Sequence, residues 1–283
     1  MGERHGINAH LIDDAGLELL AQAGIRWARI DFDWDQIQPT GPDEWRWEDT
    51  DRIVAAAGRL GMSLLGVLAY SPAWACGSDN RATPPSEPQR YLTFVRACVE
   101  RYGIGHVAAW SIWNEPNLKQ FWTGERDQFI EDIWVPGLKE IETFGLSVGP
   151  DLSSAHDNKA LQSWLPACLV AGRGLLDVVS HHQYDGHDTV AGRVKEIERL
   201  RDTVRKYPGF EHTPIWITEI GKKVPVGQAE HLAGVMAAMK DRQWWTKTFW
   251  YDSHGQGWGL LQTEQPHEPK GAYHTYAQIA REE

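Results

Sequence analysis

The feature of this sequence that most constrains its fold is a repeated alternation of short apolar runs with longer segments of helical period. Short runs rich in β-branched and aromatic residues predict strands, and apolar positions three and four residues apart predict helices. The predicted strands carry few charges, as expected of parallel strands that are covered on both faces. Eight strands are predicted, at residues 6–10, 27–32, 63–69, 108–113, 146–149, 177–182, 215–219 and 246–251.

Several of the intervening helices have recognisable ends. Asp13 or Asp14 is expected to cap the first helix, because a short acidic side chain accepts hydrogen bonds from the free N–H groups of the first turn. Thr50 is expected to cap the second helix, and Ser86 with Pro88 to open the third. The later helices are expected to bend at Pro136 and Pro166, to span residues 190–206 and 228–240, and to begin near Gly271.

Length and composition fit one domain made of these units. A closed eight-stranded α/β barrel takes roughly 250 residues, and this chain has 283. Apolar residues make up 42% of it and charged residues 24%, which is the balance of a globular protein rather than a disordered one. No Gly/Ser-rich linker or shift in composition divides the sequence. We therefore predict a single (β/α)8, or TIM, barrel over residues 1–283.

Charge and hydropathy argue against two classes of partner. Asp and Glu outnumber Lys and Arg by 39 to 28, and no basic run could follow a phosphate backbone, so nucleic acid is not expected. No stretch approaches the roughly 18 apolar residues of a spanning helix, so no membrane is expected. The opening residues lack the apolar core of a secretion signal. The sequence as written predicts a cytoplasmic protein, or a secreted one if a leader has been removed.

The longest loops direct attention to one end of the predicted barrel. In such barrels the loops that follow the strands lie at the C-terminal face, where active sites are built. Long loops of this kind are predicted at residues 33–49, 70–87, 115–126 and 252–269.

Two glutamates end predicted strands at this face. Glu115 follows the fourth strand in Trp-Ser-Ile-Trp-Asn-Glu-Pro-Asn, and Glu219 ends the seventh in Pro-Ile-Trp-Ile-Thr-Glu-Ile-Gly. Strands four and seven lie across a barrel from one another, so both carboxyl groups can face one substrate. Glycoside hydrolysis requires such a pair, separated by roughly 5–5.5 Å for retention of configuration and about 6.5–9.5 Å for inversion.

These segments carry a resemblance to a known group of enzymes. Asn114-Glu115-Pro116 and Glu219 resemble the acid/base and nucleophile of the clan of retaining barrel glycosidases, which place Asn-Glu on strand four and Glu on strand seven. Further matches make the chain most similar to glycoside hydrolase family 39. The resemblance implies a retaining glycosidase in which Glu115 is the acid/base and Glu219 the nucleophile, with an oligo- or polysaccharide as substrate and neither metal nor cofactor.

The further matches assign expected roles to other residues. Arg29 resembles the clan arginine that orders the nucleophile, and it should keep Glu219 ionised. Ser-His-His-Gln-Tyr at residues 180–184 resembles the family's Ser-x-His-x-Tyr, which makes His182 and Tyr184 site residues. Asn114 is expected to bind the sugar 2-hydroxyl. Trp250 resembles the clan tryptophan that floors the first sugar subsite.

Tryptophan is abundant, with 15 residues, and its flat apolar face suits both protein cores and sugar rings. Three tryptophans in or beside the long loops, Trp34, Trp74 and Trp122, are candidates for sugar subsites. A row of such rings favours endo action on a β-linked polysaccharide or exopolysaccharide. The chain also ends about one helix after the eighth strand, which leaves no residues for the β-sandwich that the resemblance associates with exo-β-xylosidases.

Other interpretations of the same residues remain open. An exo-β-xylosidase-like glycosidase is the alternative within the same chemistry. The 12 histidines suggest a metal-dependent barrel hydrolase as another class of enzyme. However, His5 and His10 do not form a close His-x-His, and no His-Glu-x-x-His segment occurs. Three cysteines without Cys-x-x-Cys spacing indicate no zinc site. A non-catalytic carbohydrate-binding barrel would keep the cleft without the reaction.

Overall fold

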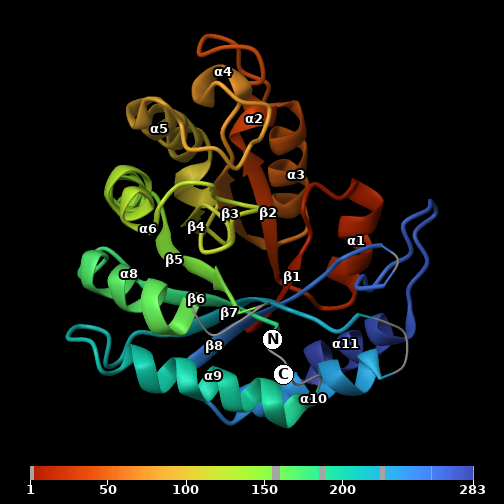
Figure 1. Cartoon of the computed structure of the whole chain (residues 1–283). Coiled ribbons are helices and arrows are strands. Elements are labelled where there is room, and N and C mark those ends of the chain that lie inside the picture. Colours follow the sequence, from red (N-terminus) through yellow and green to blue (C-terminus); the bar gives the residue numbers. More distant parts are fainter. Residues whose placement is uncertain (1–2, 155–159, 185–188, 224–226, 256, 283) are drawn as a thin grey trace.

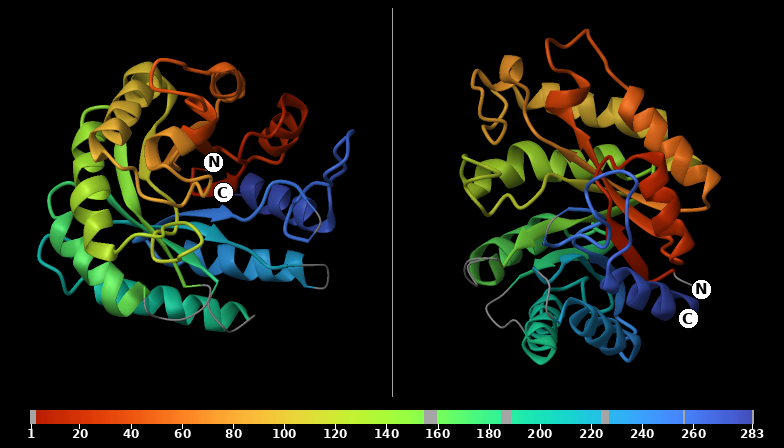
Figure 2. Two further views of the ribbon diagram at one scale, coloured as in Figure 1. Left: turned by 45° about the horizontal axis from the view of Figure 1, so that its top comes forward. Right: turned by 90° about the vertical axis from the view of Figure 1, so that its right-hand side faces the viewer.

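The computed structural model describes residues 3–154, 160–184, 189–223, 227–255 and 257–282. Within these residues eight parallel strands form a closed barrel in the order β1 to β8, and helices surround it (Figures 1 and 2). The predicted (β/α)8 barrel is confirmed. The strands are β1 His5–Asn8, β2 Trp27–Asp33, β3 Ser63–Ala69, β4 Ala109–Ile112, β5 Leu146–Ser153, β6 Val178–Gln183, β7 Ile215–Ile220 and β8 Trp245–Trp250.

The helices of the described residues follow the strands in turn, and none of them is both long and apolar enough to cross a lipid bilayer. They are α1 Asp14–Gln22, α2 Trp34–Ile37, α3 Glu48–Arg59, α4 Ala73–Cys76, α5 Pro88–His106, α6 Arg126–Gln128, η1 Phe129–Trp134, α7 Val135–Ile141, η2 Ala160–Trp164, α8 Leu165–Ala171, α9 Val190–Val204, α10 Gln228–Lys240 and α11 Gly271–Glu282.

Helix starts agree with the sequence in one case and differ in two. The Asp13 side chain accepts a hydrogen bond from the first turn of α1, as predicted. Thr50 does not cap α3, which already begins at Glu48, and the Thr50 hydroxyl donates to the carbonyl of Trp47. Ser86 does not cap α5 either, because the residue before a proline is held extended and that residue is Glu87.

The two prolines inside predicted helices mark changes of helix type. Pro136 is the second residue of α7 and Pro166 the second residue of α8, and each helix directly follows a π-helical turn, η1 or η2. A proline has no N–H to donate to the preceding turn, so the turn before it widens.

The barrel interior changes character along its axis. Its N-terminal end is filled by apolar side chains that include Trp27, Ala109, Val178, Trp216 and Phe249. Side chains two residues further along a strand point to the same side, so the next interior layer holds residues such as Arg29, Ser111 and Ser180, and all three are buried. This polar layer lies directly below the C-terminal face and supports the site there.

Strand β5 supplies part of this layer through an irregularity. Its pairing with β6 shifts register between Gly149 and Leu152, so the strand continues to Ser153 rather than ending at the predicted residue 149. A β-bulge changes the direction of the side chain that it contains. Asp151, within the bulge, is turned into the barrel and is completely buried.

Candidate active site

A cavity of about 630 Å³ opens at the C-terminal ends of the strands. Both predicted catalytic glutamates line it, together with Arg29, Asn114 and Tyr184. Aromatic side chains that were not assigned to the site also face it: Tyr70, Phe121, Tyr251 and Trp258. The closed barrel thus brings together residues far apart in sequence, such as Arg29 and Glu219, which are 190 positions apart.

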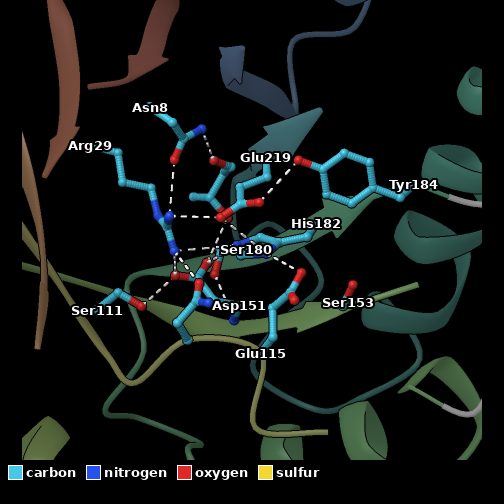
Figure 3. A network of polar contacts seen from close by, with 12 residues as sticks. Asn8, Arg29, Ser111, Glu115, Asp151, Ser153, Ser180, His182, Tyr184 and Glu219 are labelled. Carbon is cyan, nitrogen blue, oxygen red and sulfur yellow. Dashed lines mark hydrogen bonds and ion pairs between the residues drawn. The ribbon is translucent and has the colours of Figure 1, made fainter. Parts of the chain in front are cut away.

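The Glu219 carboxylate is held by one donor from β2 and one from the residue that follows β6 (Figure 3). Arg29 Nη1 donates to Glu219 Oε1 at 2.8 Å, and the Tyr184 hydroxyl donates to Oε2 at 3.0 Å. Arg29 is the third residue of β2, and its long side chain reaches from the polar layer to the carboxylate. The same guanidinium donates to Asn8 Oδ1 at 2.9 Å and to Asn114 Oδ1 at 2.7 Å.

Glu115 lies beside Glu219 and is joined to it through His182. His182 is buried in β6 and its Nδ1 lies 2.8 Å from Glu115 Oε1 and 3.5 Å from Glu219 Oε1. An oxygen of Glu115, a ring nitrogen of His182 and an oxygen of Glu219 all lie within 4.8 Å of one another. The two carboxyl groups are therefore close enough to act on one anomeric carbon.

Asp151 is a site residue that the sequence did not reveal. Its Oδ2 accepts from the Ser111 hydroxyl at 2.7 Å, and its Oδ1 accepts from the Thr218 hydroxyl at 2.6 Å. Arg29 Nη2 lies 3.4 Å from one Asp151 oxygen, and His182 Nε2 lies 3.7 Å from the other. This buried carboxylate supports both cationic side chains that contact the glutamates. The preceding Gly-Pro pair is the feature that could have indicated an irregular strand.

Burial and charge act against each other in this network. Burial acts to lower the pKa of His182, but the carboxylates of Glu219 and Glu115 raise it above the ordinary value of histidine. Burial opposes ionisation of Asp151, yet the charges of Arg29 and His182 hold its pKa below the usual range. Burial raises the pKa of Glu219, and the charges of His182 and Arg29 limit that rise. The neighbouring positive charges thus favour ionised carboxylates, and burial opposes them.

The backbone at the site adopts an uncommon conformation. Positive φ angles are rare for residues other than glycine. In the described part of the chain the non-glycine residues that adopt them are His10, Trp113, Glu115 and Asp151, at +50°, +69°, +44° and +49°. Three of the four belong to the cavity or to the network below it, and Trp113 precedes the Asn-Glu pair. Such local strain is typical of functional positions.

A second group of charged residues forms the wall of the cavity at the ends of β1 and β2. His10 Nδ1 lies 2.7 Å from Asp31 Oδ2, and Arg81 Nη2 lies 2.5 Å from Asp33 Oδ2. Burial, with the charge of Asp31, raises the pKa of Asp33 to about 7. The Arg81 guanidinium lies 4.2 Å from the centre of the Tyr70 ring. These residues were not predicted, although acidic side chains at alternate positions of a strand end were visible in the sequence.

The three loop tryptophans predicted as sugar subsites lie elsewhere. Trp34 is completely buried, stacks on Phe94 and donates its indole N–H to Gln38. Trp74 packs edge-on against Trp34 and donates to the Gln38 carbonyl, and Trp122 is buried and donates to the carbonyl of Glu125. None of the three lines the described cavity. They anchor loops, because a buried indole supplies a large apolar surface and one hydrogen bond.

The prediction that Trp250 floors the first sugar subsite is also wrong, because the aromatic residue that faces the cavity is the next one along the chain. Its side chain is completely buried on the outer side of β8, where its ring lies 6.3 Å from that of His231 on α10. The next residue, Tyr251, lines the cavity instead. Because side chains alternate between the two faces of a strand, a shift of one position reverses the assignment.

Replacement of Trp34 by alanine tests this correction. We expect it to lower the free energy of unfolding by about 3–5 kcal/mol, because it removes a large side chain from a packed core. At temperatures where the variant remains folded, KM for an aryl glycoside should stay near the wild-type value. Trp258→Ala is the matched comparison, since Trp258 lines the cavity. A raised KM for the Trp34 variant would restore its subsite role.

One set of site residues could also hold a metal ion, namely Glu115, His182 and Glu219. A metal ligand must present a free lone pair, so a histidine ligand must be neutral. The carboxylates around His182 favour its protonated form, and the Glu219 oxygens already accept from Arg29 and Tyr184. These three side chains therefore fit a hydrogen-bonded pair of carboxyl groups better than a metal-binding site.

Comparison of the sequence with known protein families assigns the chain to one of them. The model of the family described as Glycosyl hydrolases family 39 matches residues 90–243, more than half of the chain. The chain belongs to this family. Both glutamates of the cavity, Glu115 and Glu219, lie within the matched residues.

Two curated β-xylosidases are similar to this chain in sequence. The chain is 26% identical to a β-xylosidase of Geobacillus stearothermophilus over an alignment of 162 residues, and the alignment covers 48% of this chain and 32% of that protein. It is 26% identical to a β-xylosidase of Caldicellulosiruptor saccharolyticus over an alignment of 191 residues, and the alignment covers 61% of this chain and 37% of that protein. The chain thus matches roughly a third of the length of these relatives.

Solved structures share the fold at low sequence identity. A family 39 glycoside hydrolase from Bacteroides cellulosilyticus WH2 superposes with a TM-score of 0.77 and 20% identity, over 99% of this chain and 64% of that one. Xylanase 10B from Thermotoga maritima superposes with a TM-score of 0.71 and 15% identity, over 99% and 95%. At these identities the likeness establishes the barrel alone.

Proposed function

We propose that this family 39 protein hydrolyses a β-linked glycan with retention of configuration, with Glu219 as nucleophile and Glu115 as acid/base. The observation that carries the proposal is the proximity of the carboxyl groups, whose nearest oxygens lie within 4.8 Å. Retaining enzymes separate the two groups by roughly 5–5.5 Å, whereas inverting enzymes leave about 6.5–9.5 Å for a water molecule. The space between the two glutamates supports direct attack.

In the first step a Glu219 oxygen attacks the anomeric carbon while the bond to the leaving oxygen breaks. Glu115 donates its proton to that oxygen, so the leaving group departs as a neutral alcohol. The product is a glycosyl ester of Glu219. Arg29 and Tyr184 donate to separate Glu219 oxygens, so one hydrogen-bonded oxygen remains oriented when the other forms the ester.

In the second step water releases the sugar. Glu115, now ionised, accepts a proton from a water molecule, whose oxygen attacks the anomeric carbon from the side that the leaving group vacated. The bond to Glu219 breaks and the carboxylate is restored, so each glutamate returns to its starting state. His182 contacts Glu115 at 2.8 Å in the free enzyme and holds that carboxyl group in place through both steps.

The structure supports one of the residues predicted to bind substrate and removes the predicted row of tryptophans. Asn114 lies in the cavity, where Arg29 orients its carbonyl and its amide donates to the Tyr70 hydroxyl at 3.0 Å, and we propose that it contacts the 2-hydroxyl. The tryptophan row that supported endo action does not line the described cavity. An exo-β-xylosidase-like activity is therefore the second candidate, favoured by the two β-xylosidases among the relatives.

Proton NMR of the first-formed product tests the proposed mechanism. With an aryl β-glycoside as substrate, the β-anomer of the released sugar should appear first and then mutarotate, because two displacements at one carbon restore its configuration. A panel of β-xylosides, β-glucosides and β-galactosides identifies the sugar in the same experiment. The α-anomer as first product would contradict the proposal, and loss of activity in a chelator would favour a metal-dependent hydrolase.

A further inference from the structure

A second cavity of about 400 Å³ lies next to the catalytic one, between the connections that follow β1 and β8. Residues 10–13 form one side, and His254, Thr263, Gln265 and His267 form the other. His10 lines both cavities, and its ring packs edge-on against Tyr251 at 5.9 Å. One imidazole thus forms the boundary between the two spaces.

The positions of the glutamates give the catalytic cavity a direction. Glu115 follows β4 and protonates the leaving oxygen, so the leaving group lies toward the β4 side. In the closed order β1 to β8, the strands opposite β4 are β8 and its neighbours, including β1. The sugar that becomes attached to Glu219 therefore extends away from Glu115, toward the ends of β8 and β1, where the second cavity begins.

From this arrangement we infer that the second cavity is a further sugar subsite, which binds the second residue of the glycone beyond the one attacked by Glu219. The inference rests on the proposed function, because that function sets the direction of the substrate. It makes the substrate a glycan with at least two sugars on the nonreducing side of the cleaved bond.

The lining of the second cavity suits an uncharged sugar. The Asp13 carboxylate lies 3.2 Å from His267 Nε2 and also accepts from the Gln265 amide, and His10 is paired with Asp31. Both carboxylates thus already have hydrogen-bonding partners within the protein. The pKa of His254 is lowered, mainly by burial, which favours a neutral ring.

Both the polar and the apolar parts of a sugar would find partners here. The amide of Gln265 and the hydroxyl of Thr263 can exchange hydrogen bonds with sugar hydroxyls, and the half-buried Leu11 offers a surface for the C–H face of the ring. A neutral pyranose is accordingly the expected ligand. One or two hydrogen bonds of ordinary net strength correspond to about a tenfold preference.

Four chromogenic substrates test the inference: the 4-nitrophenyl β-glycosides of xylose, xylobiose, glucose and cellobiose. In at least one series the wild-type kcat/KM for the disaccharide glycoside should exceed that for the monosaccharide glycoside by about tenfold. Thr263→Trp, which fills the cavity from an exposed loop position, should reduce this ratio to near one. Thr93→Trp, at an exposed position of α5, is the matched control and should keep the wild-type ratio.

The outcomes separate the subsite from the proposed function. Equal rates for both members of each pair in the wild type, or an unchanged ratio in Thr263→Trp, would overturn the subsite while leaving the catalytic pair intact. Hydrolysis of none of the four substrates would contradict the proposed function, on which the subsite rests. Thermal unfolding of both tryptophan variants near the wild-type midpoint shows that the ratio reports binding rather than folding.

Discussion

Replacement of Glu219 by glutamine is expected to lower kcat for an aryl β-glycoside by roughly 10⁴-fold or more, the order of effect seen when a nucleophile is removed. The amide has nearly the same shape but cannot form the glycosyl ester. Arg29 then faces a neutral group instead of a carboxylate 2.8 Å away. Binding of the intact glycoside, measured by calorimetry, should survive. Glu100→Gln, at an exposed position of α5, is the matched control and should keep wild-type kcat.

A second variant distinguishes loss of the nucleophile from general damage to the site. Glu219→Ala leaves a space beside the anomeric carbon into which azide fits. Azide should attack the β-glycoside from the face that Glu219 occupied and yield an α-glycosyl azide, which NMR identifies. Wild-type turnover by the glutamine variant, or absence of the α-azide together with normal substrate binding, would contradict the assignment of Glu219.

Replacement of Glu115 by alanine is expected to lower kcat by about 10²–10⁴-fold for substrates whose leaving group needs a proton, such as disaccharides. A 2,4-dinitrophenyl glycoside should lose far less in its first step, because its leaving group departs as a stable anion. The dependence of the rate on leaving-group acidity should therefore become steeper in the variant. Comparison of kcat/KM across aryl glycosides with leaving groups of different acidity measures this dependence.

Azide also reports on this variant, with the opposite stereochemistry. In Glu115→Ala the glycosyl ester of Glu219 still forms from an activated substrate, and azide attacks it from the vacated side. The product should be a β-glycosyl azide. An α-azide from Glu115→Ala would exchange the roles of the two glutamates. A loss that is equal for all leaving groups would show that Glu115 does not act as the proton donor.

The buried layer below the glutamates explains how the site maintains opposite charges without water. Asp151 contacts Ser111 and Thr218 through short hydrogen bonds and lies close to Arg29 and His182. A buried carboxylate is tolerated only when such partners replace its lost hydration. The side chains that line the cavity therefore lie directly above a polar layer that occupies the barrel interior.

Much of the fold was predictable because parallel barrel strands are short, apolar and regularly spaced. The predicted strand at residues 63–69 matches β3, and the predicted helix at 228–240 matches α10. The π-helical turns before Pro136 and Pro166 were not predicted, since proline shows where a helix is disturbed but not how its turns adjust. The bulge in β5 was missed for a similar reason, because Pro150 suggests the end of a strand.

The positions of Glu115 and Glu219 in the cavity follow from their places at the ends of the fourth and seventh predicted strands, and the contact of Arg29 with Glu219 follows from the resemblance to the clan arginine. The tryptophans Trp34, Trp122 and Trp250 do not follow, because an indole serves a core and a sugar subsite equally well. Trp250 and Tyr251 are adjacent in sequence and face opposite sides of the wall, so a single step in register decides which one meets the substrate.

The sequence by itself determined the order of strands and helices and the placement of Glu115 and Glu219 at one end of the barrel, since these depend on local periodicity and on residues at strand ends. Only the tertiary structure decided which aromatic rings reach the cavity, that Asp151 supports Arg29 and His182, and that the loops after β1 and β8 enclose a second cavity. Those features depend on the closure of the barrel, which brings β8 against β1 and turns each side chain inward or outward.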